Sequence, residues 1–426
     1  MIFLKPLCAA CFYIVNVGIP KHCMLTKYNK KGKIKNKVFG GVHLKKEFAR
    51  KVSDIERFYI SLAECGINTT IRCLIKTDKR PPAEIIVAAA KSALRNCKGI
   101  NLKYKRGKWF FSDKIPEYLS YRAYCDNISD SPVSFLNYRE YTLRVSEIHH
   151  IKTDTYYISV ECFHGACDGM SLLNFVYELF AAMDDKKTER FCCNLTDWDI
   201  VKGNFVKNGE KLPLKPLCAA KESFDTKFDL PGSFWATPKF SSWNTSGKIS
   251  YAISQCFLSP AIVMIPVDIR KYCEFNEYPI GNLALPVILD CGGKSKDDIS
   301  SEIMEKLKNK APLSKNMAKN PILRITPSFL LNFAVYKYLN YLEKSKDHVL
   351  CALVSHLGKI DSKRLENRYF EATDIVFQLE CMPFFAFSVV SAEFNKKLNV
   401  ICCYDKGRVS PKTVEMLYEN LNKYLD

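Results

Sequence analysis

The sequence lacks an uninterrupted apolar run long enough to cross a bilayer. The uncharged stretch from Pro6 to Pro20 contains Asn16 and is shorter than the roughly 20 apolar residues that a membrane-spanning helix needs. Lys5 precedes this stretch as the basic region of a signal peptide would, but no small-x-small cleavage site follows its apolar centre. The sequence therefore predicts neither a membrane span nor export.

Cysteines at metal-binding spacing are also missing. The 19 cysteines are scattered, and one CxxC pair, Cys8 and Cys11, has neither a second such pair nor two histidines at finger spacing. Others, such as Cys162 and the adjacent Cys402 and Cys403, have apolar neighbours and are typical of small buried residues in a reducing compartment. We therefore expect no metal site and a cytoplasmic location.

Acidic residues are scarce in one segment. Between Lys21 and Lys51 there are eleven lysines or arginines against a single acid, Glu47, so this segment supplies most of the net charge of +18. Such a run is usually a solvated arm, and the remainder of the chain is only mildly basic, which argues against nucleic-acid binding by the body. A mildly basic body suits a partner that carries phosphates, such as coenzyme A or a phosphopantetheine arm.

The length of 426 residues predicts two compact lobes rather than one core. We divide the chain into a basic N-terminal appendage (1–50), an N-terminal lobe (51–205), a linker or long loop rich in Lys, Gly, Pro and Ser (206–250), and a C-terminal lobe (251–426). In each lobe the expected strands and helices follow no strict alternation. That order predicts α+β layers, with a mixed sheet flanked by helices in each lobe, rather than a doubly wound parallel sheet.

The apolar periodicity predicts the individual elements. In the first lobe the expected strands are 69–75, 139–149 and 155–163, with a hairpin over 101–112 and helices from Pro82 and over 170–183. In the second lobe the expected strands are 261–267, 349–354, 385–392 and 398–404, with helices over 300–310 and 330–343 and a last helix from Ser410.

One segment carries the residues for acid–base chemistry. His164 follows a buried strand, and Asp168 and Gly169 come four and five residues later. The small residues Gly165 and Ala166 let the chain turn sharply after the strand. An imidazole at such a strand end can take a proton from an alcohol or amine near neutral pH.

A second His-x-x-x-Asp match, from His150 to Asp154, has a different setting. It lies in a polar turn, no glycine follows the aspartate, and the chain continues into a strand rather than a helix. The context predicts a hairpin loop and no catalytic role.

The segment from His164 to Gly169 resembles the active-site motif of the chloramphenicol-acetyltransferase-like superfamily. That superfamily includes peptide-synthetase condensation domains, alcohol acetyltransferases, and plant acyltransferases with an HxxxD motif. Condensation domains usually carry a second histidine where this chain has Phe163, which moves the likeness toward alcohol acetyltransferases. The DFGWG segment of the plant enzymes is missing, and the late region reads Cys-Met-Pro-Phe-Phe-Ala-Phe over 381–387.

Two further segments follow in the order found in that superfamily. Residues 266–270 end in Arg270 and are followed by Gly281 and Asn282. Residues 355–360 begin with Ser355 and are similar to the Ser-Asn-Leu-Gly stretch of alcohol acetyltransferase-like proteins.

The resemblance implies two lobes with a cleft or tunnel between them and assigns roles to these residues. His164 would be the general base, and Asp168 would turn away from the substrate to form a buried ion pair with Arg270. Asn282 and Ser355 are candidate substrate or tunnel residues, whereas His356 is expected to be satisfied within the fold. Cys167 is not expected to be a nucleophile, since the superfamily uses no acyl-enzyme.

The implied activity is transfer of an acyl group from a coenzyme A or phosphopantetheine thioester to a small-molecule alcohol or amine. The thioester is then a co-substrate, and no permanently bound cofactor is expected. A monomer is expected, because one chain supplies both lobes. Three alternatives remain: a condensation-type domain that meets a carrier protein in trans, a catalytically silent binding protein of the same fold, and a nucleic-acid binder acting through residues 21–51.

Overall fold

The protein is described from a computed structural model, which covers most of the two predicted lobes. The residues described are 48–114, 118–131, 133–186, 189–206, 212–213, 215–221, 233–236, 244–318, 321–345 and 347–425. Most of the appendage expected at 1–50, including Cys8 and Cys11, lies outside the described residues.

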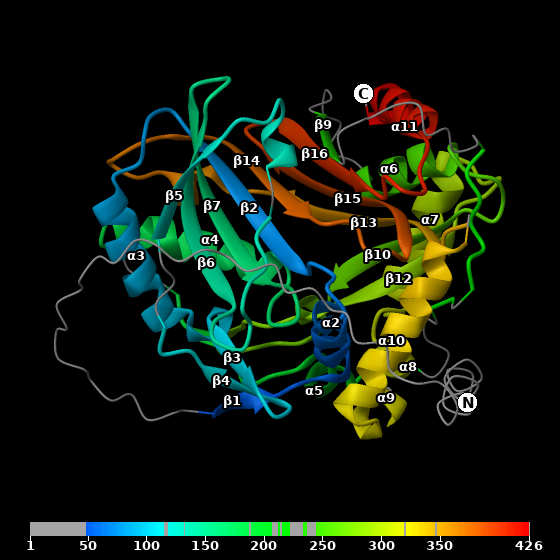
Figure 1. Cartoon of the computed structure of the whole chain (residues 1–426), viewed down its shortest axis with the longest axis horizontal. Helices are drawn as coiled ribbons and strands as arrows, with labels where there is room; N and C mark the ends of the chain where they lie inside the picture. Colours follow the sequence, from blue (N-terminus) through cyan, green and yellow to red (C-terminus); the bar gives the residue numbers. More distant parts are fainter. Residues whose placement is uncertain are drawn as a thin grey trace, which may run out of the picture.

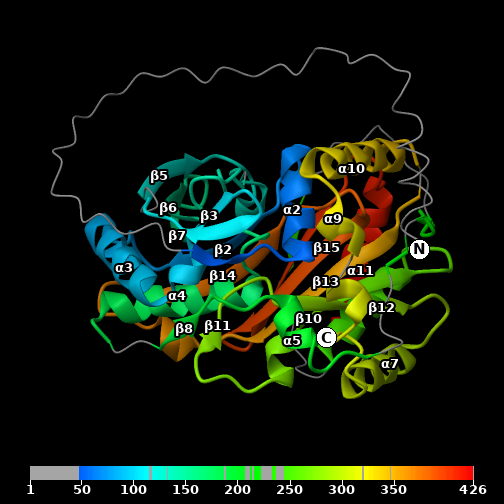
Figure 2. The same cartoon turned by 90° about the horizontal axis from the view of Figure 1, so that it is seen from below.

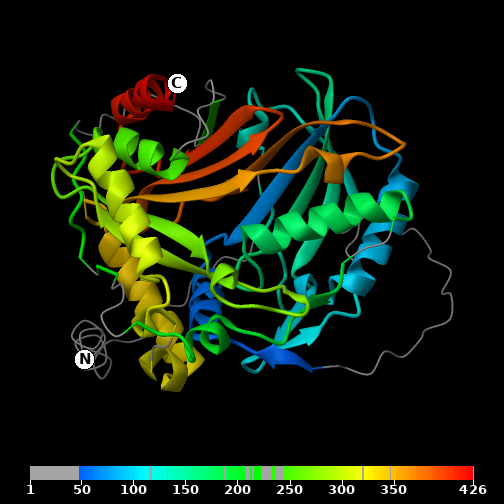
Figure 3. The same cartoon turned by 180° about the vertical axis from the view of Figure 1, so that it is seen from behind.

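The first lobe is built on a five-stranded mixed sheet (Figure 1). Its strands are, in spatial order, β14 (Ala372–Leu379), β2 (Thr70–Thr77), β7 (Thr155–Phe163), β6 (Leu143–His150) and β5 (Tyr118–Ala123). Neighbours are antiparallel except for the parallel pair β5 and β6. Helices α3 (Ala83–Asn96) and α4 (Gly169–Met183) pack together on one face of this sheet (Figure 3).

A smaller sheet and a capped helix complete this lobe. The hairpin expected over 101–112 is confirmed as β3 (Leu102–Lys105) and β4 (Lys108–Phe111), and β1 (Phe48–Lys51) pairs with β4. Helix α2 (Asp54–Glu64) begins after Ser53, whose hydroxyl accepts from the Glu56 backbone N–H while the Glu56 carboxylate accepts from the Ser53 N–H. This reciprocal cap satisfies donors that would otherwise be left unpaired at the start of the helix.

The second lobe is built on a six-stranded mixed sheet. Its strands are, in spatial order, β12 (Ala284–Asp290), β10 (Ile262–Asp268), β13 (Leu350–Lys359), β15 (Phe385–Phe394), β16 (Lys397–Tyr404) and β9 (Ser233–Ala236). Helices α6 (Thr245–Ser254), α7 (Lys296–Lys308) and α11 (Pro411–Leu425) share one core with it. Helix α10 (Ser328–Glu343) lies on the opposite side from α7 (Figure 2) and contributes to a core that contains residues of both lobes.

Short elements connect the two lobes. Strand β8 (Phe191–Cys192) pairs in parallel with β11 (Tyr278–Pro279). The remaining helices are α5 (Asp197–Val201), α8 (Lys315–Ala318) and α9 (Pro321–Ile325), with short 3₁₀ turns at Lys98–Ile100, Ile128–Asp130, Ile269–Tyr272 and Ser362–Leu365.

These observations confirm the α+β class with a mixed sheet in each lobe, but they correct the division of the chain. Strand β14 falls in the range expected for the C-terminal lobe, yet it crosses over and pairs with β2 of the first lobe. It covers an edge of that sheet, whose backbone groups would otherwise lack partners. A strand's own sequence carries no mark of which sheet edge it joins, so local patterning could not predict this crossover.

The segment expected to be a linker, 206–250, also contains regular structure. Strand β9 pairs with β16, and α6 begins at Thr245. The abundance of Gly, Pro and Ser in this segment masked a short edge strand, because such strands carry a weak periodic signal. Similarly, β13 does not end at Val354 but continues to Lys359, through the Ser355 segment.

Within the described part of the chain, no helix combines the length and apolar character needed to traverse a bilayer.

Candidate active site

The strand β7 ends at Phe163, and the chain turns at once. The His164 backbone N–H donates to the Thr69 carbonyl at 2.9 Å, and the Ala166 N–H donates back to the Phe163 carbonyl at 2.9 Å. Gly165 is required here, because a Cβ at this position would lie 2.4 Å from a ring carbon of Phe163. The turn therefore places the His164 side chain at the end of the central strand.

The imidazole of His164 is held in one tautomer. Its Nδ1 lies 3.0 Å from the carbonyl oxygen of Cys167. A carbonyl can only accept, so Nδ1 carries the proton and Nε2 of the neutral ring keeps its lone pair. Burial lowers the pKa of His164 below its usual value of 6.5, which favours this neutral form near pH 7.

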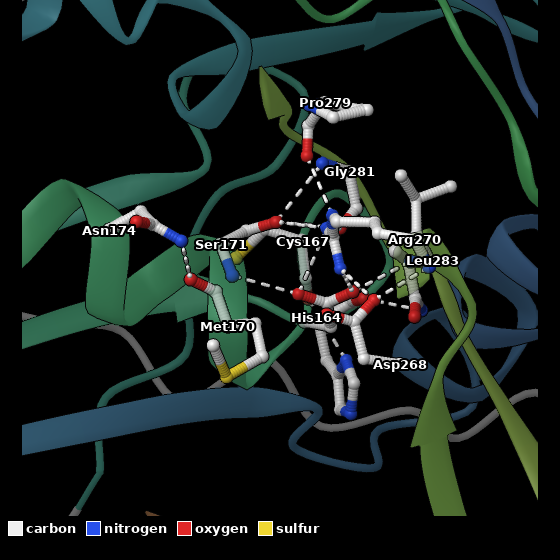
Figure 4. Close-up of polar contacts among 12 residues, drawn as sticks. His164, Cys167, Met170, Ser171, Asn174, Asp268, Arg270, Pro279, Gly281 and Leu283 are labelled. Carbon is white, nitrogen blue, oxygen red and sulfur yellow. Dashed lines mark hydrogen bonds and ion pairs between the residues drawn. The ribbon is translucent and has the colours of Figure 1, made fainter. Parts of the chain in front are cut away.

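The ring of His164 is also fixed by an aromatic neighbour. The Tyr59 ring, from α2, stacks on it with centroids 4.6 Å apart and planes at 30°. The His164 side chain is nevertheless partly exposed. It points away from the polar cluster around Arg270 (Figure 4). The ring is therefore oriented by its neighbours, while the residue as a whole keeps some exposure to solvent.

Asp168 is the N-cap residue of α4 and is buried. Its carboxylate accepts from the backbone N–H of Ser171 at 2.8 Å and of Leu283 at 2.7 Å. Arg270 donates to both carboxylate oxygens, at 3.0 and 3.3 Å. Burial alone would raise the pKa of Asp168, but the charge of Arg270 and these hydrogen bonds outweigh it and hold the pKa below its usual range. The carboxylate is thus ionised and fully engaged.

Arg270 joins the two lobes through its guanidinium. It lies just after β10 of the second lobe, and its ion pair with Asp168 of the first lobe is buried on both sides. The remaining acceptors around it are the Asp268 carboxylate and the Ser171 hydroxyl, together with the carbonyls of Pro279 and Gly281 (Figure 4). The planar guanidinium donates its hydrogen bonds in fixed directions. It therefore fixes the orientation of Asp168 as well as balancing its charge.

The loop backbone is held by residues from distant parts of the chain. Asn282 donates through its side-chain amide to the His164 carbonyl at 2.9 Å. Arg50, from β1, donates to the Ala166 carbonyl at 3.2 Å. The Asp168 N–H donates to the Gly281 carbonyl at 3.2 Å. These contacts leave the loop few alternative conformations.

In the segment that begins at Ser355, the side chain of Leu357 lies beside Gly169 of the His164 motif. A Cβ on Gly169 would lie 2.9 Å from a terminal methyl carbon of Leu357, so the glycine allows the second lobe to approach the start of α4 closely. Ser355 precedes Leu357 by two residues on β13, and its side chain is partly exposed. His356 contacts the Ser391 hydroxyl at 3.0 Å through Nδ1, in keeping with a satisfied residue.

Asn282, a candidate substrate or tunnel residue from the sequence, is buried. Its side-chain amide donates to the His164 carbonyl, so it supports the loop backbone. Cys167 is buried, and burial raises the pKa of its thiol well above the usual value. Its carbonyl, not its sulfur, contacts the His164 ring. No group of three or more His, Cys, Asp or Glu side chains in the described ranges is arranged to hold a metal ion.

The second His-x-x-x-Asp segment, from His150 to Asp154, forms a hairpin loop between β6 and β7 as expected. Both ring nitrogens of His150 are engaged, Nδ1 with the Thr153 hydroxyl at 2.7 Å and Nε2 with the Cys125 carbonyl at 2.9 Å. Asp154 is exposed and pairs with His149 instead.

Four residues around the site were missed by the sequence analysis: Tyr59, Arg50, Ser171 and Asp268. Ser171 follows the capping aspartate by three residues, and Asp268 precedes Arg270 by two, so both lay beside motifs already identified. Tyr59 and Arg50 reach the loop from more than 100 residues away and carry no local signal.

The fold can be compared with those of known proteins. No protein-family model matches the sequence, and no curated protein is similar to it in sequence. The structure, however, is similar to polyketide synthase associated protein 5 from Mycobacterium tuberculosis, with a TM-score of 0.58 and 12% identity over 88% of this chain and 97% of that one.

Two further solved structures share the fold. The condensation domain of the Monacolin K polyketide synthase MokA matches with a TM-score of 0.56 and 8% identity, over 88% of this chain and 96% of that one. The cyclization-docking bidomain of the EpoB peptide synthetase from Sorangium cellulosum matches with a TM-score of 0.56 and 13% identity, over 88% of this chain and 83% of that one. The chain therefore has the two-lobed fold that these three solved structures share, a condensation domain among them.

Proposed function

We propose that this protein is an acyltransferase that moves an acyl group from a coenzyme A or phosphopantetheine thioester to an alcohol or amine. The observation that carries this proposal is the tautomer of His164. With Nδ1 committed to the Cys167 carbonyl, the basic Nε2 is the atom left to receive a proton.

The proposed reaction is a direct transfer. His164 Nε2 takes the proton of the acceptor's hydroxyl or amine as the acceptor's oxygen or nitrogen bonds to the thioester carbonyl carbon. The tetrahedral oxyanion then collapses, the carbon–sulfur bond breaks, and the imidazolium returns a proton to the leaving thiolate. Atoms and charge balance without an acyl-enzyme, and much of the rate comes from orienting two bound substrates.

Asp168 is a positioning residue in this proposal. Its lone pairs are taken by Arg270 and by two backbone N–H groups, so it does not relay a proton from the imidazole. Instead it fixes the start of α4, and with it the Cys167 carbonyl that orients the ring.

The test is thiol release from acetyl-CoA and hexanoyl-CoA in the presence of primary alcohols or amines. His164→Ala should lower the rate at least about 100-fold, the usual contribution of a general base. His150→Ala is the matched control, because it removes a histidine of the same spacing pattern and should leave the rate unchanged. Full activity in His164→Ala would sink the assignment.

A second candidate is a condensation-type activity on carrier-bound acyl groups. The match to a polyketide synthase condensation domain over nearly its whole length favours it. The same acyl group should then be offered on coenzyme A and on a phosphopantetheinylated carrier protein. Exclusive use of the carrier-bound form would select this candidate, and consumption of neither thioester with any acceptor would favour a silent binding protein.

A further inference from the structure

Helices α9 and α10 carry an apolar face that the rest of the described fold leaves uncovered. The inner side of α10 contributes to the core through Leu331, Val335, Leu339 and Leu342. On the outer side, Phe329 is 71% exposed, Tyr336 51% and Phe333 38%, and Ile325 at the end of α9 is 79% exposed. We call Ile325, Phe329, Phe333 and Tyr336 the α9–α10 face.

The spacing of these residues makes the surface continuous along α10. Phe329, Phe333 and Tyr336 are separated by four and three positions, so they lie on the same side of the helix. Figure 2 shows α10 running along an edge of the molecule. A row of large exposed apolar side chains on one helix side marks an interaction surface, whereas isolated ones are ordinary.

The segment that carries this face is basic. Between Lys315 and Lys344, which contains α8, α9 and α10, the sequence has five lysines or arginines and one acid, Glu343. Arg324, Lys337 and Lys344 are exposed, and the Lys337 ammonium lies 5.5 Å from the centroid of the Phe333 ring. Apolar and cationic groups therefore occupy the same surface.

The presence of apolar and cationic side chains on one surface limits the kinds of partner that can bind there. A second copy of the chain would bring two cationic surfaces together, which costs energy, and double-stranded nucleic acid offers phosphates but no apolar layer for Ile325 and Phe329. A bilayer with anionic lipids accepts both groups, with aromatic and aliphatic side chains at the headgroup boundary and lysines and arginines against the lipid phosphates.

We propose that the α9–α10 face docks this protein on the surface of an anionic membrane without crossing it. Arg57 of α2 donates to the Arg324 carbonyl at 3.0 Å and also to the carbonyls of Leu323 and Thr326. The same helix carries Tyr59, which stacks on His164. The docked surface is thus tied to the helix beside the candidate active site, and docking fixes how that site is presented to the bilayer.

The experiment is co-sedimentation of the full chain with vesicles of phosphatidylcholine in which about one third of the lipid is phosphatidylglycerol, and with phosphatidylcholine alone. The chain should pellet with the anionic vesicles and be released by added salt. Phe329→Ser should lower the partition coefficient about tenfold, because it removes one large apolar side chain from the contact. Lys337→Gln should lower it about fivefold.

The matched control is Phe135→Ser, which removes a phenylalanine that is 60% exposed on the first lobe and should leave binding unchanged. Equal pelleting of the Phe329 and Phe135 variants would overturn the proposal. It would also fail if vesicles do not bind and sedimentation shows a dimer that Phe329→Ser dissociates, since the face would then be a contact between copies. None of these readouts depends on acyl transfer, so the result stands whether or not the proposed activity is found.

Discussion

The two His-x-x-x-Asp segments lie at opposite ends of the same strand. His150 to Asp154 precedes β7, and His164 to Asp168 follows it. They share a spacing pattern and a strand, yet their surroundings differ. In the first, neighbours from the same lobe engage both ring nitrogens and leave the aspartate exposed. In the second, the other lobe adds partners, Arg270 and Leu283 for the aspartate and Asn282 for the loop backbone.

The comparison teaches that spacing alone does not make a site. The residues that distinguish the two segments are Arg270, Asn282 and Leu283, which come from the second lobe. They turn one aspartate into a fixed, buried anion and hold the loop that orients one imidazole. Besides the loss of His164 itself, three changes test this difference between the two segments.

The largest expected effect comes from removing the partner of the buried carboxylate. Arg270→Met leaves Asp168 ionised without its counter-charge and should lower the free energy of unfolding by about 3–5 kcal/mol. Arg270→Lys should fall between this variant and the natural protein, because a lysine keeps the charge but cannot bridge both oxygens.

Urea denaturation measures these variants, with Asp154→Asn as the counterpart at the other segment. The Asp154 side chain is 85% exposed, and asparagine tolerates its left-handed backbone (φ 47°), so this change should cost at most about 0.5 kcal/mol. If Arg270→Met and Asp154→Asn cost the same, the ion pair does not stabilise the junction of the lobes.

The next effect concerns pH. Burial lowers the pKa of His164 below 6.5, so the neutral, basic form predominates at pH 7 and is lost as the pH falls through that lowered pKa. The value of kcat/KM should therefore fall about tenfold per pH unit on the acidic side, with a midpoint below 6.5.

A pH series of kcat/KM for the natural protein and for His150→Ala measures this midpoint, which should be the same in both. A midpoint clearly above 6.5 would mean that the folded protein stabilises the imidazolium relative to the imidazole, contrary to the expected effect of burial. A shift in His150→Ala would mean that the two segments are coupled.

The smallest expected effect tests the close contact between lobes at the glycine. Gly169→Ala pushes a methyl group against the end of the flexible Leu357 side chain, which can shift, and should cost about 1 kcal/mol of stability. The corresponding position after Asp154 is Thr155, where a side chain is already accommodated. Thermal or urea unfolding measures this cost.

Pairing Gly169→Ala with Leu357→Ala tests the cause. The double variant should lose less than the sum of the two single variants, because the smaller side chain makes room for the added methyl. Additive losses would show that the contact with Leu357 is not what requires the glycine.

Several features were predictable because they are local. The end of β7, the small residues of the turn, the capping position of Asp168 and the start of α4 follow from residues within ten positions of His164. The hairpin over 101–112 and most strands of both sheets were equally accessible from periodicity. Context also separated the two His-x-x-x-Asp segments, because only one is followed by a glycine and a helix.

The α+β composition, the two lobes and the segment that carries the imidazole therefore follow from the amino-acid sequence alone. Tertiary structure decided that β14 crosses to the first sheet, that Tyr59 stacks on His164, and that Arg50 holds the Ala166 carbonyl. The reason is physical: backbone propensities and caps act between near neighbours. These contacts join residues more than 100 positions apart, and their energy is realised only when the distant segments have been brought together.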